Sequence, residues 1–239
     1  MAIETNKVRD IKDMSSLLSF LSGELGWELP SDASLEEMTY DWTGTELRLE
    51  DKFSGKLKGG VVRQLKPMCN DQPWGIFMVE LNDDIQHRGL LREILRGLVA
   101  NRRRDPSLPG WQHDNLLFVC ATRDYDRITF AHFRGEKMQK ARLATFGWQR
   151  ESPYLRTLCE FNLPAICWPA DTADSDGWLK AWAAAFDKEP LTREFFKRFD
   201  KALEAIKADL QELQKMASAE AYSRAQLLLE RLLFLYFLQ

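Results

Sequence analysis

The spacing of apolar residues over positions 1–150 indicates an α/β domain. Apolar residues at helical spacing predict an amphipathic helix that begins at Asp10 or Asp13 and ends near Glu24. Short alternating or continuous apolar runs predict strands at Thr39–Glu50, Lys58–Met68, Trp74–Leu81, Asn115–Thr122 and Asp126–Arg134, with a further edge strand at Ala141–Trp148. Between the third and fourth strands, His87–Arg104 has a face of Leu and Ile residues that predicts a helix. We therefore expect a mixed sheet flanked by helices.

The pattern becomes helical from Ser152 onward. Helices are predicted at Ser152–Glu160, Asp176–Phe186, Leu191–Met216 and Ala219–Gln239. We expect an α/β domain over residues 1–150 and a helical region over residues 151–239. Within the helical region, the composition changes most clearly near Phe186–Leu191, around Pro190, and this change marks the best domain boundary.

The segment Arg224–Gln239 (RAQLLLERLLFLYFLQ) is the most apolar helix of the chain. Its leucine and phenylalanine residues cover more than half of the helical circumference, so the helix must be buried on most sides. No Gly, Pro or capping signal follows it. We therefore expect that a larger protein has been cut here, and that its missing part covers this helix.

The helical region also resembles a known family. The sequences LTREFFKRFDKALEAI at Leu191–Ile206 and RAQLLLERLLFLYFLQ at Arg224–Gln239 resemble the helical lead-in to the methyltransferase domain of large restriction–modification enzymes. These are the type IIG-like and BREX-like adenine-N6 DNA methyltransferases. Upstream, Asp71–Leu81, the Arg-rich helix after it and Asp126–Gly135 resemble the N-terminal region of some of these proteins.

The resemblance implies a DNA-modifying system of restriction and phage defence. It implies a downstream methyltransferase domain in the same polypeptide, and S-adenosylmethionine is expected only in that domain. The Asn-Pro-Pro-Tyr-type active site and the Gly-containing cofactor loop of such a domain do not occur in these residues. The fragment is therefore not expected to methylate DNA by itself.

Charge and cysteine content restrict the kinds of partner and the cellular compartment that we expect. The net charge is −3, so contact with DNA must come from a local basic patch rather than from the whole chain. The four cysteines show no metal-ligand spacing, which favours reduced thiols in a cytoplasmic protein. The apolar terminal stretch is interrupted by Glu230 and Arg231, and no run is long enough to span a bilayer, so no membrane partner is expected.

The order helix, three strands, helix, strand is that of the PD-(D/E)XK nuclease core, which several restriction–modification fusions carry at their N-terminus. Such a nuclease needs one acid on a strand, and an acid and a lysine two residues apart on the next. The carboxylates hold Mg²⁺, and the lysine positions the attacking water. Glu80 ends the third strand and is the first candidate, with Asp41 as the second carboxylate. The position two residues after Glu80 is Asn82, which cannot supply the cation.

A second placement of the nuclease motif uses Glu50 and Lys52, with Asp41 upstream. These residues fit the spacing, but they lie where the chain leaves a strand and enters a Gly- and Lys-rich loop. The other interpretation of Glu80 is a strand-end carboxylate that is solvated or paired with an arginine. We therefore expect a nuclease-like sheet that does not cut DNA, with Glu80 as a ligand of Mg²⁺ only if the site is active.

Arginines gather in and after the second predicted helix. They are Arg88, Arg92, Arg96, Arg102, Arg103 and Arg104. The first three lie at i, i+4 and i+8, on one side of a helix. Because the planar guanidinium donates two hydrogen bonds at once, arginine suits phosphate groups, and these residues are candidate DNA contacts. The alternatives are a solvated face, with the last three arginines complementing the helix dipole, or contact with the missing domains.

Three functions remain open. The favoured one is the N-terminal module of a restriction–modification or phage-defence methyltransferase, which engages DNA or acts as a scaffold and is not catalytic alone. The second is an active Mg²⁺-dependent endonuclease that uses Glu80 with Asp41, or Glu50 and Lys52. The third is a protein-interaction module whose terminal helix docks onto its own downstream domain.

Overall fold

The computed structural model describes residues 3–30, 33–47, 49–82, 89–91, 93–94, 115–134, 142–153, 155–186 and 189–237. The chain forms two compact units, Met1–Phe186 and Asp187–Gln239. The division falls at the change in composition near Phe186–Leu191. The helices between residues 155 and 186 belong to the first unit, together with the sheet.

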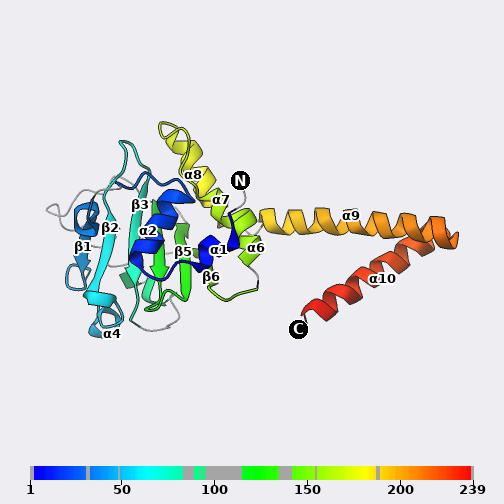
Figure 1. Ribbon diagram of the computed structural model, residues 1–239, viewed down its shortest axis with the longest axis horizontal. Coiled ribbons are helices and arrows are strands. Elements are labelled where there is room, and N and C mark those ends of the chain that lie inside the picture. Colours follow the sequence, from blue (N-terminus) through cyan, green and yellow to red (C-terminus); the bar gives the residue numbers. More distant parts are fainter. Residues whose placement is uncertain are drawn as a thin grey trace. The chain divides into compact units, whose positions relative to one another are not determined.

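The first unit is built on a mixed six-stranded sheet with the strands in sequence order (Figure 1). The strands are β1 (Thr39–Thr43), β2 (Val61–Leu65), β3 (Trp74–Glu80), β4 (Asn115–Ala121), β5 (Arg127–Arg134) and β6 (Arg142–Gln149). Strands β3 and β4 are parallel, and every other neighbouring pair is antiparallel. The predicted α/β class and mixed sheet are therefore confirmed.

Strand β1 is shorter than the sequence pattern predicts. The prediction extends it to Glu50, but the strand ends at Thr43. The Glu46 carboxylate accepts hydrogen bonds from the backbone N–H of Thr43, at 2.8 Å, and from its hydroxyl, at 2.9 Å. This side chain satisfies backbone polarity locally, so the chain turns here although the β-type residues continue.

The central strands are covered on both faces, which explains their continuous apolar sequences. Every residue of β3 is buried, and its side chains alternate between two separate cores. Ile76 and Met78 belong to one core, whereas Phe77 and Val79 belong to the other. A strand buried on both faces needs no polar side, so period-two alternation is absent from its sequence.

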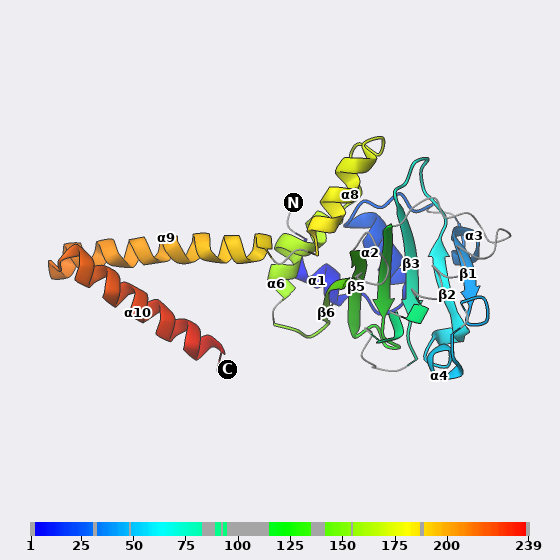
Figure 2. The same ribbon diagram turned by 180° about the vertical axis from the view of Figure 1, so that it is seen from behind.

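One face of the sheet is covered by the N-terminal helices and by the helices that follow β6. They are α1 (Thr5–Arg9), α2 (Met14–Gly23), α6 (Leu155–Thr157), the π-helical turn Leu158–Asn162, α7 (Leu163–Ala165) and α8 (Ser175–Ala184). Figure 1 and Figure 2 show α1 and α2 together on one side of the strands. Asp13 is the N-cap of α2 and accepts the backbone N–H of Ser16 at 2.8 Å, which settles the start of this helix.

Tryptophan side chains join α8 to this face. The Trp182 ring lies 5.2 Å from that of Trp27 and 5.7 Å from that of Trp74 on β3, centroid to centroid. Its indole N–H donates to the carbonyl of Cys167 at 2.9 Å. Trp178 packs edge-on against it at 5.4 Å. Aromatic rings of this size bury a large apolar area, so the cluster fixes the helices to the sheet.

The opposite face is covered by α4 (Asp51–Ser54), the segment that follows it, and helical residues between β3 and β4. Leu90, Leu91 and Ile94 are buried in the same core as Phe77 and Phe118. A helix that connects two parallel strands is the expected crossover. The rest of the helix predicted at His87–Arg104 lies outside the described residues.

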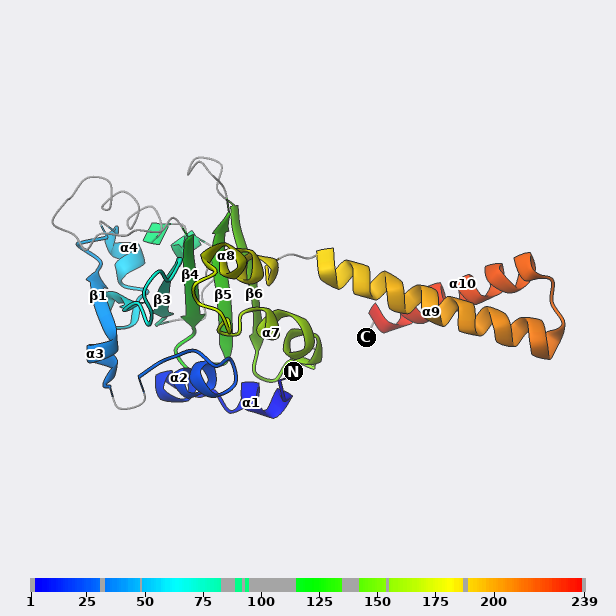
Figure 3. The same cartoon turned by 90° about the horizontal axis from the view of Figure 1, so that it is seen from above.

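The second unit is a helical hairpin of α9 (Glu189–Gln214) and α10 (Ser218–Phe237) (Figure 3). Within this unit Leu203, Ala221 and Ala225 are buried. Many large apolar side chains are instead exposed, and they are Phe195, Phe196, Leu213, Tyr222, Leu227, Leu228, Leu232, Phe234, Leu235 and Tyr236. Within this hairpin, α9 therefore does not provide the burial expected for the terminal helix.

Two further expectations concern thiols and membranes. Cys69, Cys120, Cys159 and Cys167 are free cysteines. Burial raises the pKa of the Cys120 thiol, so the thiol stays protonated at neutral pH. Among the described residues, no helix has the length and apolar character needed to cross a membrane.

Candidate functional site

Glu80 is a buried carboxylate at the end of β3, with only 5 % of its surface exposed. Its Oε1 atom accepts a hydrogen bond from Lys58 Nζ and another from the Tyr125 hydroxyl, each at 2.6 Å. Its Oε2 atom accepts from the guanidinium of Arg63, also at 2.6 Å. Each carboxylate oxygen is therefore bound by a cation, and the negative charge is compensated by Lys58 and Arg63.

The register of the sheet explains why these groups meet. Arg63 on β2 pairs with Met78 on β3, so both side chains lie on the same face, and Glu80 follows two residues later on that face. Lys58 lies in a short 3-10 turn just before β2. Tyr125 lies in the turn between β4 and β5 with φ of 54°, a left-handed conformation. Its hydroxyl donates to Glu80 at the end of β3.

Asn82 has a structural role at the position where the nuclease motif requires lysine. Its side-chain amide donates to the carbonyls of Gly55 and Leu57, at 3.1 and 3.0 Å. Its backbone N–H donates to the carbonyl of Lys56 at 2.8 Å. Asn82 thus fastens the segment that leads into Lys58, and the cation reaches Glu80 from that segment.

The ionisation of the site follows from these interactions. Burial raises the pKa of Glu80, but the hydrogen bonds from Lys58 and Tyr125, with the charges of Lys58 and Arg63, outweigh burial and lower it below the ordinary value. Burial, and then the hydrogen bond to Glu80, raise the pKa of Tyr125. At neutral pH the carboxylate is ionised and the phenol is protonated, so Tyr125 donates and Glu80 accepts.

Asp41 contacts the same cluster by an ion pair with Arg63. It pairs with Arg63 across β1 and β2, and its Oδ1 atom lies 3.7 Å from Arg63 Nε. The guanidinium therefore contacts both carboxylates proposed as Mg²⁺ ligands. Arginine keeps its charge at all accessible pH values, and here it binds a Glu80 oxygen that a divalent ion would need. The arrangement of Asp41 and Glu80 does not fit Mg²⁺.

The remaining candidates are not brought to this cluster. Lys52 pairs with Glu50 at 2.6 Å, and both side chains are more than 60 % exposed at the start of α4. Within the described part of the chain, no three His, Cys, Asp or Glu side chains gather as a metal site. The candidate DNA contacts Arg88, Arg92, Arg96, Arg102, Arg103 and Arg104 lie outside the residues whose side chains are described.

Sequence reasoning misses three of the four residues of the site. The glycines around Lys58 suggest only a flexible hairpin, and neither Arg63 nor Tyr125 has a motif around it. The adjacent glycines Gly59 and Gly60 are one local signal in the sequence, and both adopt positive φ in the structure, 69° and 70°. Two adjacent glycines ahead of a strand indicate a tight turn that fixes the preceding side chain.

Comparisons with known proteins provide no relative from which a role for these residues can be transferred. The chain matches no protein-family model, no curated protein and no solved structure. The chemistry of Glu80 and its partners is therefore the basis for any functional conclusion.

Proposed function

We propose that this chain is the N-terminal module of a DNA restriction–modification or phage-defence methyltransferase, in which a nuclease-like sheet engages DNA or acts as a scaffold without cleaving it. Its support comes from the order of elements, from the charge balance around Glu80 and from the exposed face of the helical hairpin.

The order of elements agrees with the nuclease-like assignment. Helix α2 precedes the antiparallel strands β1, β2 and β3, which are interrupted by the short helix α4 and a 3-10 turn between β1 and β2, and a further short helix of residues 35–38 precedes β1. Helical residues then lead to β4, which is parallel to β3. This is the helix–three-strand–helix–strand order of the PD-(D/E)XK core. Fold order says little about activity, so activity depends on the residues at the end of β3.

The observation that carries the proposal is the pairing of Glu80 with Lys58 and Arg63. A nuclease carboxylate must present free lone pairs to a divalent ion, because Mg²⁺ binds oxygen at about 2.0–2.1 Å in a demanding octahedral geometry. Here both Glu80 oxygens accept hydrogen bonds from cations, and Asp41 shares one of those cations. An internal ion-pair network takes the place of a metal site.

The helical hairpin supports the position within a larger enzyme. Exposed Leu228, Leu232 and Leu235 on α10 form an apolar surface that needs a covering partner. The proposed partner is the downstream methyltransferase domain of the same polypeptide, which would hold S-adenosylmethionine. The sequence resemblance at Leu191–Ile206 and Arg224–Gln239 agrees with this partner.

DNA engagement is tested by retention of a labelled duplex at low salt. Replacing Arg102, Arg103 and Arg104 with alanine should weaken retention, because the variant neutralises fewer phosphates and so releases fewer counterions from the DNA. The matched control replaces Lys197, Lys201 and Lys215 with alanine, which removes the same charge elsewhere. Equal retention by both variants, or no retention by the native chain, contradicts DNA engagement through these arginines.

One observation favours the alternative of an active endonuclease. Lys58 approaches Glu80 at 2.6 Å and could take the role that Asn82 cannot fill. Incubation of plasmid DNA with the chain and Mg²⁺ separates the two functions. The proposed module leaves the plasmid intact, whereas cleavage that disappears in Glu80→Gln establishes the nuclease.

A further inference from the structure

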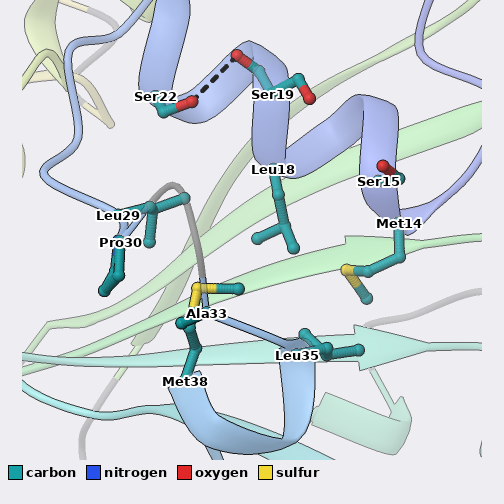
Figure 4. Close-up of a pocket in the computed structure, with 10 residues that line it drawn as sticks. All are labelled: Met14, Ser15, Leu18, Ser19, Ser22, Leu29, Pro30, Ala33, Leu35 and Met38. Carbon is teal, nitrogen blue, oxygen red and sulfur yellow. Dashed lines mark hydrogen bonds between the residues drawn. The ribbon is translucent and has the colours of Figure 1, made fainter.

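A groove of about 590 Å³ lies between α2 and α3 (Leu35–Met38), on a part of the surface separate from Glu80. Figure 4 shows Met14 and Leu18 pointing from α2 toward Leu35 and Met38 of α3. Leu29 closes one end from the loop between the two helices. The apolar lining therefore comes from two helices and the loop that joins them.

The lining residues are only half-buried, so the groove is open to solvent rather than closed as a cavity. Met14, Leu18, Leu29, Leu35 and Met38 all retain partial exposure. Unbranched methionine side chains adapt their shape to a bound surface, which suits a groove with a methionine on each wall. An open apolar groove with adaptable walls fits an extended or helical partner better than an enclosed small molecule.

The wall of the groove formed by α2 allows close approach of another helix. Ser15, Ser19 and Ser22 lie at i, i+4 and i+7 along the helix and border the groove. Small side chains shorten the distance at which two helices can pack. With ten residues, α2 extends for roughly 15 Å at 1.5 Å per residue, which accommodates about three turns of a partner helix.

The sequence that forms the groove is rich in acidic residues. Between Lys12 and Arg48 the sequence contains eight acidic residues and no Lys, Arg or His. Two of these acids, Glu28 and Glu36, are exposed and adjoin the lining residues Leu29 and Leu35. Within the described residues, neither Glu28 nor Glu36 forms an ion pair. Lys66 Nζ donates a hydrogen bond to the backbone carbonyl of the neighbouring Glu37 at 2.6 Å.

We propose that this groove binds an amphipathic helix that carries lysine or arginine beside its apolar stripe. The apolar side chains would enter between Leu18 and Leu35, and the basic residues would face Glu28 and Glu36. This inference goes beyond the proposed DNA function, because an acidic surface repels phosphate. Its partner is a protein segment, and its outcome does not depend on whether the chain engages DNA.

The test measures fluorescence anisotropy of a labelled helical peptide of about 14 residues with the whole chain. The peptide has leucine at i, i+3, i+4 and i+7 and lysine on both flanks, and a second peptide has glutamate in place of each lysine. The lysine peptide should bind at least about tenfold more tightly, because its charges complement the acidic rim. Equal binding of the two peptides overturns the proposal.

Variants assign the binding to the groove. Glu28→Lys with Glu36→Lys should weaken binding about tenfold, whereas Glu50→Lys with Asp51→Lys on α4 makes the same charge change elsewhere and should weaken it less than about twofold. Ser19→Trp places an indole at the exposed edge of the groove and should abolish binding. An equal effect of the two lysine pairs, or unchanged binding by Ser19→Trp, contradicts the proposal.

A small apolar molecule is the rival occupant. Titration with an apolar fluorescent dye distinguishes it, because the Ser19→Trp variant would remove dye binding as well. Dye binding that depends on Ser19, without any binding of the lysine peptide, overturns the helix proposal and assigns the groove to a small molecule.

Discussion

The two units of this chain differ in the burial of the same kinds of apolar residue. In the first unit Trp74 and Phe118 are 1 % and 0 % exposed, whereas in the second unit Leu232 and Phe234 are 53 % and 64 % exposed. The first unit covers a sheet with helices on both faces. The described residues of the second unit form two helices, and within that unit each helix buries only the side that faces the other.

The difference shows that the number of layers, rather than the residue type, decides which apolar side chains are enclosed. On α10, Ala221 and Ala225 face α9 and are buried, while apolar residues outside that face have nothing within the hairpin to cover them. Nine acidic and nine basic residues lie between Asp187 and Gln239, so this unit also lacks a net charge to resist association. The hairpin by itself therefore leaves apolar side chains uncovered.

The largest difference in stability between the units is expected when one ring is truncated in each. Phe118→Ala removes a ring that stacks on Phe77 at 5.3 Å inside the enclosed sheet. We expect a loss of about 3–5 kcal/mol in the free energy of unfolding, from reduced burial and the remaining cavity. Tryptophan fluorescence in urea is the measurement, because all eight tryptophans precede Asp187 and report on the first unit alone.

The control for Phe118→Ala is Phe234→Ala on the exposed side of α10. It should leave the tryptophan transition unchanged, because the removed ring is 64 % exposed and belongs to the other unit. A loss for Phe234→Ala as large as that for Phe118→Ala would contradict the exposure of the Phe234 ring.

Glu80 is a buried charge in the first unit. Glu80→Gln keeps the shape but removes the charge that compensates Lys58 and Arg63. We expect a loss of about 2–3 kcal/mol in urea unfolding, below the value for a fully buried pair because Lys58 is about half exposed. Glu50→Gln, on an exposed ion pair, should change stability by less than about 0.5 kcal/mol.

The effect of Glu80→Gln should depend on pH. The pKa of Glu80 is lowered in the folded protein, so its stabilisation is fully present above the ordinary pKa of 4.5 and is lost as pH falls through the lower folded value. Between about pH 5 and pH 7, where the carboxylate stays ionised, the difference in stability between native protein and variant should be constant. A difference that is independent of pH down to about pH 2 would contradict the lowered pKa.

A smaller effect is expected when the neutral partner of the site is removed. Tyr125→Phe deletes only the hydroxyl that donates to Glu80 Oε1. We expect a loss of about 1.5 kcal/mol, typical of a hydrogen bond to a charged group, measured by tryptophan fluorescence in urea. The pKa of Glu80 should also rise, because a hydrogen bond that lowers it is removed. Unchanged stability would indicate that water replaces the hydroxyl and that the site is less enclosed than its burial implies.

The smallest effect on stability is expected on the exposed face of the hairpin. Leu232→Ser with Leu235→Ser should change the unfolding free energy by less than about 0.5 kcal/mol, because both side chains are more than half exposed. Circular dichroism measures helix melting, and light scattering measures association, which should fall in this variant. A marked loss of helix stability would instead mean that these leucines are already covered.

The sequence alone determined the class of the fold and most of its elements. The continuous apolar run at Trp74–Glu80 and the alternation at Arg127–Arg134 indicate strands because each pattern reports how many faces a strand buries. The apolar residues after Asp10 and Asp13 indicate helix α2 in the same way, and the structure selects Asp13 as its N-cap. These patterns are local, so they can be interpreted without knowing what the element packs against.

The role of Glu80 follows from the three-dimensional fold rather than from its neighbours along the chain. Its partners Lys58, Arg63 and Tyr125 are 22, 17 and 45 residues away along the chain. The register of β2 and β3 and the turn after β4 bring them together, and no local pattern encodes those distances. Sequence spacing could propose Asp41 and Glu80 as a pair, but only the fold places the charge of Arg63 between them. A charged cluster depends on three-dimensional distance, whereas helices and strands are determined largely by neighbours along the chain.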